Sequence, residues 1–133
     1  METLGIGSDI TECLRMARMI ERHGELFINR VFTPDEVNYC QNRKQATQHF
    51  AARWAAKQAV LKAIGARWRR GISWLDIEIV SDTQGRTAAS VRGALRDIMV
   101  QRSVRKIMLS TSHCRTHACA FAIALGGKEK PSP

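Results

Sequence analysis

The sequence of 133 residues predicts an α+β fold in which one long helix lies on a sheet. The first observation is the segment 45–64, which is apolar on most sides at helical spacing and is therefore typical of a core helix. The second is a pair of strand-like segments, 106–112 and 117–125, of which the last alternates alanine with bulkier residues. Because both of its faces are apolar, we expect both to be buried.

Local signals predict the elements before the long helix. We expect a short strand over residues 4–9, which glycines 5 and 7 loosen, and the pair Asp9 and Glu12 then indicates the start of a helix over 10–23. The segment Thr33-Pro34-Asp35-Glu36 is a stronger start signal, because it offers an N-cap, a proline at the first helical position and a capping-box glutamate.

Similar signals predict the remaining elements and the extent of the domain. Residues 77–81 and 87–91 are typical of strands around a turn at Gln84-Gly85, and 91–102 of a helix. No repeat or linker divides the chain. We therefore expect one domain over residues 1–126 and a flexible tail at 127–133.

Composition excludes several classes of protein. Hydrophobic residues make up 44%, too many for a disordered chain, yet no apolar run approaches the roughly 20 residues of a membrane span. The N-terminus lacks the pattern of a signal peptide. The four cysteines show no paired CxxC spacing, which indicates reduced thiols and a cytoplasmic protein.

The long helix carries amines where a core helix should be apolar. At helical spacing, Lys57 falls among Phe50, Trp54, Leu61 and Ile64. A buried charge costs several kcal/mol unless it is paired, so we expect an anion to meet this helix. The alternative is that the lysine extends its amine to water.

A first candidate site combines Asp9 with Gln58 and Lys62, which share a flank of the helix, and with the basic loop 65–71. A carboxylate and lysines suit a phosphate ligand bridged by Mg²⁺, and the net charge of +9 implies an acidic partner. Two simpler interpretations remain open: Asp9 caps a helix, and the loop is a solvated turn.

Two further candidate sites have less support. His113, His117 and Cys119, with Cys40 or Cys114, offer zinc ligands on one strand face, but their spacing matches no common zinc signature. Nucleic-acid binding would use the arginines of the first helix, but aromatic residues are only 6% of the chain, few for stacking on bases.

Five motifs follow one another between Leu4 and Leu125: GIGSDITE (5–12), FTPDE (32–36), FAARWAAKQAVLKA (50–63), ISWLDIEI (72–79) and STSHCRTHACAFAIAL (110–125). Because it carries them in this order and spacing, the chain resembles holo-[acyl-carrier-protein] synthases, the small bacterial 4′-phosphopantetheinyl transferases. The resemblance implies an α+β fold and a homotrimer with active sites between subunits. It also implies coenzyme A as donor, Mg²⁺ as cofactor and a serine of an acidic acyl carrier protein as acceptor.

The resemblance also implies roles for individual residues. Asp9 corresponds to the metal-binding aspartate of the family, and Lys62 to a lysine near the transferred phosphate. Coenzyme A would be contacted at Arg53, Gly85, Arg86 and His113, and the carrier protein at Arg15, Met19, Arg22 and Phe27.

Three departures from the family pattern bear on activity. Gln58 stands where the family has a glutamate that binds metal and is a proposed base, so the second position of the metal pair is a neutral amide. Arg86-Thr87 replaces Lys-Pro in a turn beside the nucleotide, and a glycine expected near Ala66 is absent. The sequence therefore predicts a transferase, with two alternatives: a non-catalytic homologue that binds coenzyme A or the carrier protein, and an RNA-associated basic protein.

Overall fold

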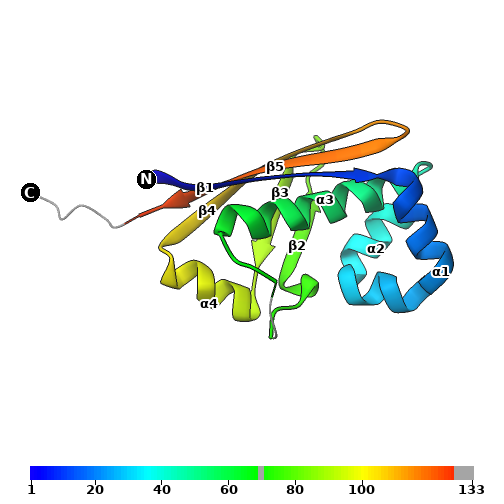
Figure 1. Cartoon of the computed structure of the whole chain (residues 1–133). Helices are drawn as coiled ribbons and strands as arrows, with labels where there is room; N and C mark the ends of the chain where they lie inside the picture. Colours follow the sequence, from blue (N-terminus) through cyan, green and yellow to red (C-terminus); the bar gives the residue numbers. More distant parts are fainter. Residues whose placement is uncertain (69–70, 128–133) are drawn as a thin grey trace, which may run out of the picture.

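In the computed structural model, which describes residues 1–68 and 71–127, a long helix crosses one face of an antiparallel sheet. The helix is α3 (Ala46–Ile64), and the strand order is β1-β5-β4. The strands are β1 (Glu2–Glu12), β4 (Val104–His113) and β5 (His117–Gly126), as Figure 1 shows. The predicted α+β class and the predicted packing of the long helix on a sheet are confirmed.

Two glycines of β1 bring the strand backbone directly against the helix backbone. A Cβ added at Gly7 would lie 2.0 Å from the carbonyl oxygen of Ala59, and one added at Gly5 would lie 2.0 Å from that of Ala63. Any side chain would therefore separate the two elements. The expected loosening of the strand is limited to a register shift between Thr3 and Gly5, and the two glycines are also the condition for its contact with α3.

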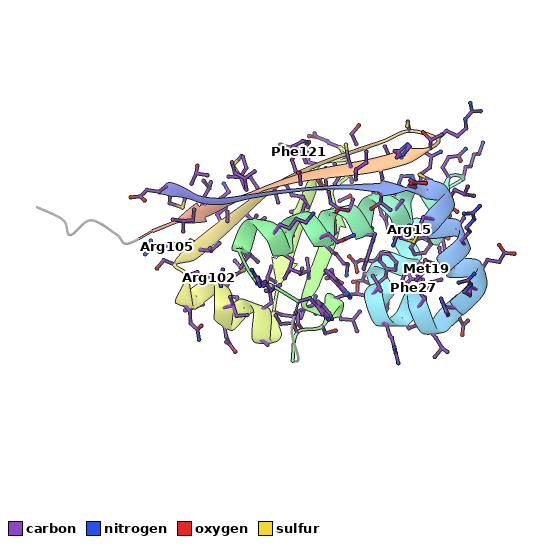
Figure 2. All side chains as sticks on the ribbon, viewed as in Figure 1. Arg15, Met19, Phe27, Arg102, Arg105 and Phe121 are labelled. Carbon is purple, nitrogen blue, oxygen red and sulfur yellow. The ribbon has the colours of Figure 1, made fainter. Side chains whose placement is uncertain are left out.

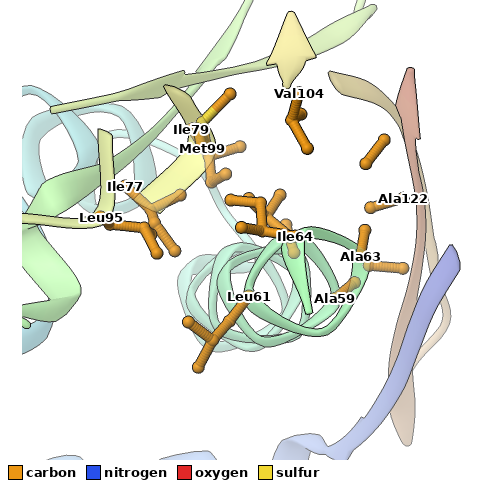
Figure 3. Close-up of a cluster of buried hydrophobic side chains, with 14 of the residues drawn as sticks. Ala59, Leu61, Ala63, Ile64, Ile77, Ile79, Leu95, Met99, Val104 and Ala122 are labelled. Carbon is orange, nitrogen blue, oxygen red and sulfur yellow. The ribbon is translucent and has the colours of Figure 1, made fainter. Parts of the chain in front are cut away.

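One hydrophobic cluster packs the two helices that precede α3 on its first half, and another lies between α3 and the elements that follow it. Besides β4 and β5, these are a short 3₁₀ turn (Trp74–Asp76), β2 (Ile77–Ser81), β3 (Thr87–Val91) and α4 (Gly93–Gln101). Figure 3 shows Ile64 close to Met99, while Ala59 and Ala63 face Ala122 of β5. The predicted strands are confirmed at their residues, and the helix begins two residues later than expected because β3 extends through Val91.

Helix α1 begins at Cys13 and ends at Val31. The predicted start at residue 10 is wrong, because β1 stays paired with β5 as far as Glu12 and His117. The helix continues past residue 23 through a kink at Gly24, where φ is 55°. Helix α2 (Pro34–Gln41) begins with the predicted capping box: Thr33 N donates to Glu36 Oε1 at 2.8 Å, and Glu36 N donates to Thr33 Oγ1 at 3.3 Å.

The sheet has one covered and one uncovered face within the chain. The alanines of β5 at positions 118, 120, 122 and 124 are buried against α3. On the other face Phe121 is 59% exposed, and Figure 2 shows it projecting away from the helix. The prediction that both faces of β5 are buried is therefore wrong for the isolated chain. Within the described ranges, no helix is long and apolar enough to cross a bilayer.

Candidate active site

An exposed ion pair joins β1 to the C-terminal half of α3. Asp9 Oδ1 lies 3.3 Å from Lys62 Nζ, which also donates to the carbonyl oxygen of Ser8 at 3.0 Å. Thr11 Oγ1 donates to Asp9 Oδ2 at 3.1 Å. The Lys62 side chain is 55% exposed and that of Asp9 only 13%. Asp9 therefore lies inside a strand and faces α3, so the interpretation that it caps a helix is wrong.

A cavity of about 340 Å³ opens beside Asp9, between β1, α1 and α3. Its polar wall includes Asp9 and Gln58, which the sequence placed in one site, together with Glu12, Arg15 and His117. Its apolar wall is made by Ile10, Met16, Met19, Phe27 and Trp54. The cavity therefore combines a polar rim, which carries charges of both signs, with a hydrophobic wall.

Three of the four residues expected to dock a carrier protein reach this cavity. Figure 2 shows Arg15, Met19 and Phe27 grouped along α1. Arg22 lies instead with Arg18 and Glu21 in a separate surface depression. The basic face of α1 thus extends from the cavity to the outer surface of the protein.

The donor set fits a Mg²⁺ ion that is held largely by a phosphate-bearing substrate. Asp9 supplies one carboxylate, Gln58 supplies one amide oxygen, and the two share a cavity wall. Among the described residues, no three His, Cys, Asp or Glu side chains form a cluster that could hold a metal. Magnesium often takes one or two carboxylates and completes its shell with water and substrate phosphate, which matches this site.

Lys57, five residues before Lys62, has a different environment. It lies 2.7 Å from Glu36 Oε1 with both side chains fully buried, and it donates to the carbonyl oxygens of Val31, Trp74 and Ile77. The anion expected at this position is therefore supplied by the chain itself. Lys57 ties α3 to α2 and β2 and contacts no cavity wall of the site.

Arg53 and His113 belong to a second polar group, on the flank of α3 that faces α2. The Arg53 guanidinium lies 3.8 Å from the centre of the Tyr39 ring and is 4% exposed, and its Nε has no hydrogen-bond partner among the described residues. His113 Nδ1 is 2.9 Å from Gln48 Oε1, and its ring contacts that of His49. Burial lowers the pKa of Arg53, so an anion here would offset the cost of a charge that is buried.

The turn between β2 and β3 is anchored to this second group. Arg53 donates to Ser81 Oγ at 3.3 Å, and Ser81 ends β2 just before the turn. Within the turn Gly85 has a φ of 81°, and Asp82 Oδ1 accepts from Arg86 N at 2.9 Å. The structure therefore brings Arg53 and the predicted turn residues to one side of the molecule, whereas the cavity beside Asp9 is lined by neither.

Two other expectations do not combine into sites. In the β4–β5 register Cys119 pairs with Ser112 and Ala118 pairs with His113, so His113 does not share the face of His117 and Cys119. This register removes the predicted zinc set. In the basic loop Arg67 is exposed, and residues 69–70 lie outside the described part of the chain.

Sequence reasoning missed two polar residues of the cavity. Glu12 had been assigned only to helix capping, and His117 only to the zinc set. Glu12 gave no signal of its place, because residues three positions apart on a strand point to opposite faces and it reaches the cavity only at the junction of β1 with α1. His117 gave no such signal, because its place at the cavity depends on the pairing of β5 with β1.

Comparisons with known proteins show the family of the chain and relatives with the same fold. Residues 5–122 match the family profile of the 4′-phosphopantetheinyl transferase superfamily. The holo-[acyl-carrier-protein] synthase of Protochlamydia amoebophila is 46% identical over 121 residues, which cover 91% of this chain and 97% of that protein. The crystal structure of the synthase from Neisseria meningitidis has a TM-score of 0.84 at 29% identity, covering 93% and 99% of the two chains. A synthase from Bacillus anthracis in complex with coenzyme A (3′,5′-ADP) has a TM-score of 0.76 at 29% identity, with coverage of 94% and 98%.

Proposed function

The chain belongs to the 4′-phosphopantetheinyl transferase superfamily, and from that premise we propose that it transfers 4′-phosphopantetheine from coenzyme A to a serine of an acyl carrier protein. The observation that carries this proposal is the cavity in which Asp9 and Gln58 share a wall while Lys62 pairs with Asp9. The net charge of +9 suits two anionic substrates. The free cysteines suit the reducing cytoplasm, where these substrates would meet.

In this reaction the serine oxygen attacks the β-phosphate of coenzyme A, forming one P–O bond, while the P–O bond to 3′,5′-ADP breaks. Asp9 and the Gln58 amide would hold Mg²⁺, which when bound offsets negative charge on the pyrophosphate. Lys62 is half-exposed and near the site, so it can leave Asp9 and neutralise the phosphate as a point charge. The apolar wall of the cavity gives the pantetheine arm a surface from which water is excluded.

The second polar group is proposed to hold the nucleotide half of coenzyme A. Arg53 offers a buried guanidinium whose Nε has no hydrogen-bond partner in the described part of the chain. His113 and the turn with Gly85 and Arg86 would supply further hydrogen-bond donors to the phosphates of coenzyme A. Because this group and the Asp9 cavity have no lining residue in common within one chain, one coenzyme A molecule would be shared between two subunits.

The basic face of α1 is proposed to dock the carrier protein. Arg15 and Arg22 supply charge along the helix, and Met19 and Phe27 supply apolar contact next to the cavity. Such a face would orient an acidic partner so that its serine enters the cavity, and its charges would act mainly on association.

The uncovered face of the sheet supports a homotrimer. Ile6 and Ile10 of β1 are 68% and 69% exposed, and Met108 of β4 is 50% exposed beside Phe121. In the strand register Ile6, Ile123 and Met108 lie side by side, so the residues form one continuous apolar surface. A surface of this kind marks an interface. Sedimentation at micromolar concentration should give a trimer, and a monomer would contradict the assignment.

One experiment decides between transfer and the alternative of a binding protein without turnover, which the amide at Gln58 favours. The protein is incubated with coenzyme A, Mg²⁺ and an apo-acyl carrier protein, and the carrier is weighed by intact-mass spectrometry. A gain of one phosphopantetheine group supports the proposal. Coenzyme A binding without any mass gain would support the non-catalytic alternative.

A further inference from the structure

Four aromatic rings connect the cavity beside Asp9 to the loop that follows α3. Phe27 and Trp54 line the cavity, and their ring centres are 6.3 Å apart. Trp74 lies 4.9 Å from Trp54, and Trp68 stacks on Trp74 at 4.4 Å with an angle of 15° between the ring planes. Of the four side chains only that of Trp68 is exposed, at 49%. The series therefore runs from the cavity wall to the protein surface.

The core holds the exposed end of this series in place. The carbonyl oxygen of Trp74 accepts from the buried amine of Lys57 at 3.0 Å, and the Trp74 side chain packs against both hydrophobic clusters. Trp68 lies flat on this fixed ring. A ring that is already stacked loses little further freedom when a partner covers it, so its apolar area contributes to binding at a low entropic cost. A tryptophan held in this way is typical of a residue that anchors a protein partner.

Charge and distance indicate which partner would cover Trp68. Arg67, its neighbour in the loop, is exposed, and Arg15 lies on the cavity wall, so an acidic protein is complementary to both. An interface of ordinary size buries roughly 800 Å² on each protein, a patch about 30 Å across. Three ring contacts, none longer than 6.3 Å, separate Phe27 from Trp68. A protein that docks on Phe27 can therefore contact Trp68 as well.

We propose that Trp68 and Arg67 form a second docking contact for the acyl carrier protein, on a different element from the basic face of α1. This inference rests on the proposed transferase function. The carrier protein contacts α1 and the loop together: Trp68 buries its exposed surface on the carrier, and Arg67 meets one of its acidic side chains. Contacts on two separate elements fix the orientation of the carrier as well as its position, and so direct its serine to the cavity.

The first test is Trp68→Ala, which leaves every lining residue of the cavity in place. Calorimetry measures binding of the apo-carrier protein without coenzyme A, and intact mass measures transfer at varied concentrations of each substrate. We expect the Kd and KM for the carrier to rise at least about tenfold, because truncating a tryptophan anchor costs that much or more. The KM for coenzyme A should stay within about twofold. Val100→Ala, at an exposed apolar position on α4, is the matched control and should change none of these values.

A second variant, Arg67→Gln, leaves the ring stack intact and separates docking from folding. We expect its affinity for the carrier to fall about threefold or more at low salt and to approach that of the wild type at high salt, because salt screens an exposed charge. Wild-type affinity for the carrier in either variant would overturn the proposal. An equal rise in the KM for coenzyme A in Trp68→Ala would also overturn it, since the loop would then serve the donor. Wild-type protein that transfers nothing would instead refute the transferase function, whereas failure of this inference leaves wild-type transfer intact.

Discussion

Lys57 and Lys62 lie five residues apart on α3 and each pairs with a carboxylate, yet their surroundings differ completely. The pair of Lys57 with Glu36 is fully buried at 2.7 Å, and three backbone carbonyl oxygens complete the shell of the amine. The pair of Lys62 with Asp9 is longer, at 3.3 Å, and its lysine is 55% exposed. The same helix therefore carries one amine that is fixed and one that is free to move.

Burial decides which of the two amines is available to a ligand. Desolvation lowers the pKa of Lys57, and the charge of Glu36 and its hydrogen bond raise it. Removing either partner would leave an uncompensated charge in the core. The pair of Lys62 with Asp9 contributes little to stability, because exposed ion pairs are worth only about 0–1 kcal/mol. Asp9 can therefore bind a metal ion, or Lys62 a phosphate, at little cost in stability. The stability of the fold should therefore depend on the pair of Lys57 with Glu36, and phosphopantetheine transfer on the pair of Lys62 with Asp9.

The largest expected effect is on folding. Lys57→Met leaves the Glu36 carboxylate buried without its cation, so we expect the free energy of unfolding to fall by about 3–5 kcal/mol. Urea denaturation followed by circular dichroism measures the change. The matched control is Lys62→Met on the same helix, which should lower stability by no more than about 1 kcal/mol. Equal losses for the two variants would contradict the comparison.

The second effect is on catalysis. Lys62→Met removes a positive charge from beside the proposed phosphate position, and we expect kcat for carrier-protein modification to fall by about 10²-fold. Intact-mass assays at saturating substrate measure the rate. Lys62→Arg retains charge and should lose less. A Lys62→Met variant with full activity would show that the exposed amine takes no part in transfer.

A third and smaller effect concerns the metal. Gln58→Glu places a second carboxylate beside Asp9, and a charge this near a divalent ion should tighten Mg²⁺ binding by at least about tenfold. Calorimetric titration of Mg²⁺, with and without coenzyme A, measures it. For the wild type we expect weak binding that strengthens when coenzyme A is present. If the variant binds Mg²⁺ no better than the wild type, position 58 does not ligate the metal.

The smallest effect tests partial burial at His49. Burial, followed by the charges of His113, Arg43 and Arg53, lowers the pKa of His49 below its ordinary value of 6.5. The unfolded chain then binds a proton that the folded chain refuses, so stability falls as pH drops through about 6.5. His49→Gln should reduce this loss by less than about 1 kcal/mol, because solvent screens a half-buried ring. Thermal unfolding at about pH 7 and pH 5 measures this loss of stability. A His49→Gln variant that loses more stability on acidification than the wild type would contradict the prediction.

The sequence predicted what local chemistry determines and missed what distant pairing determines. The capping box of α2 and the extent of α3 were readable because their signals lie within a few residues. The start of α1 was not, because Glu12 stays in β1 only through its pairing with His117, far along the chain. Asp9, Gln58 and Lys62, which the family resemblance and helical spacing group together, lie near one another in the structure, and their roles stay a prediction. The partner of Lys57 was unforeseen, because Glu36 reaches it only once α2 has packed on α3.

The contact of Gly5 and Gly7 with α3 has a consequence for how the enzyme can change over time. At these two positions backbone meets backbone, so no side chain separates the strand that carries Asp9 from the helix that carries Gln58 and Lys62. A substitution at either glycine would push the two elements apart and lengthen the distance between Asp9 and Lys62. The spacing of the reactive groups thus depends on two residues that take no part in the chemistry, and these two positions can hardly vary in sequence.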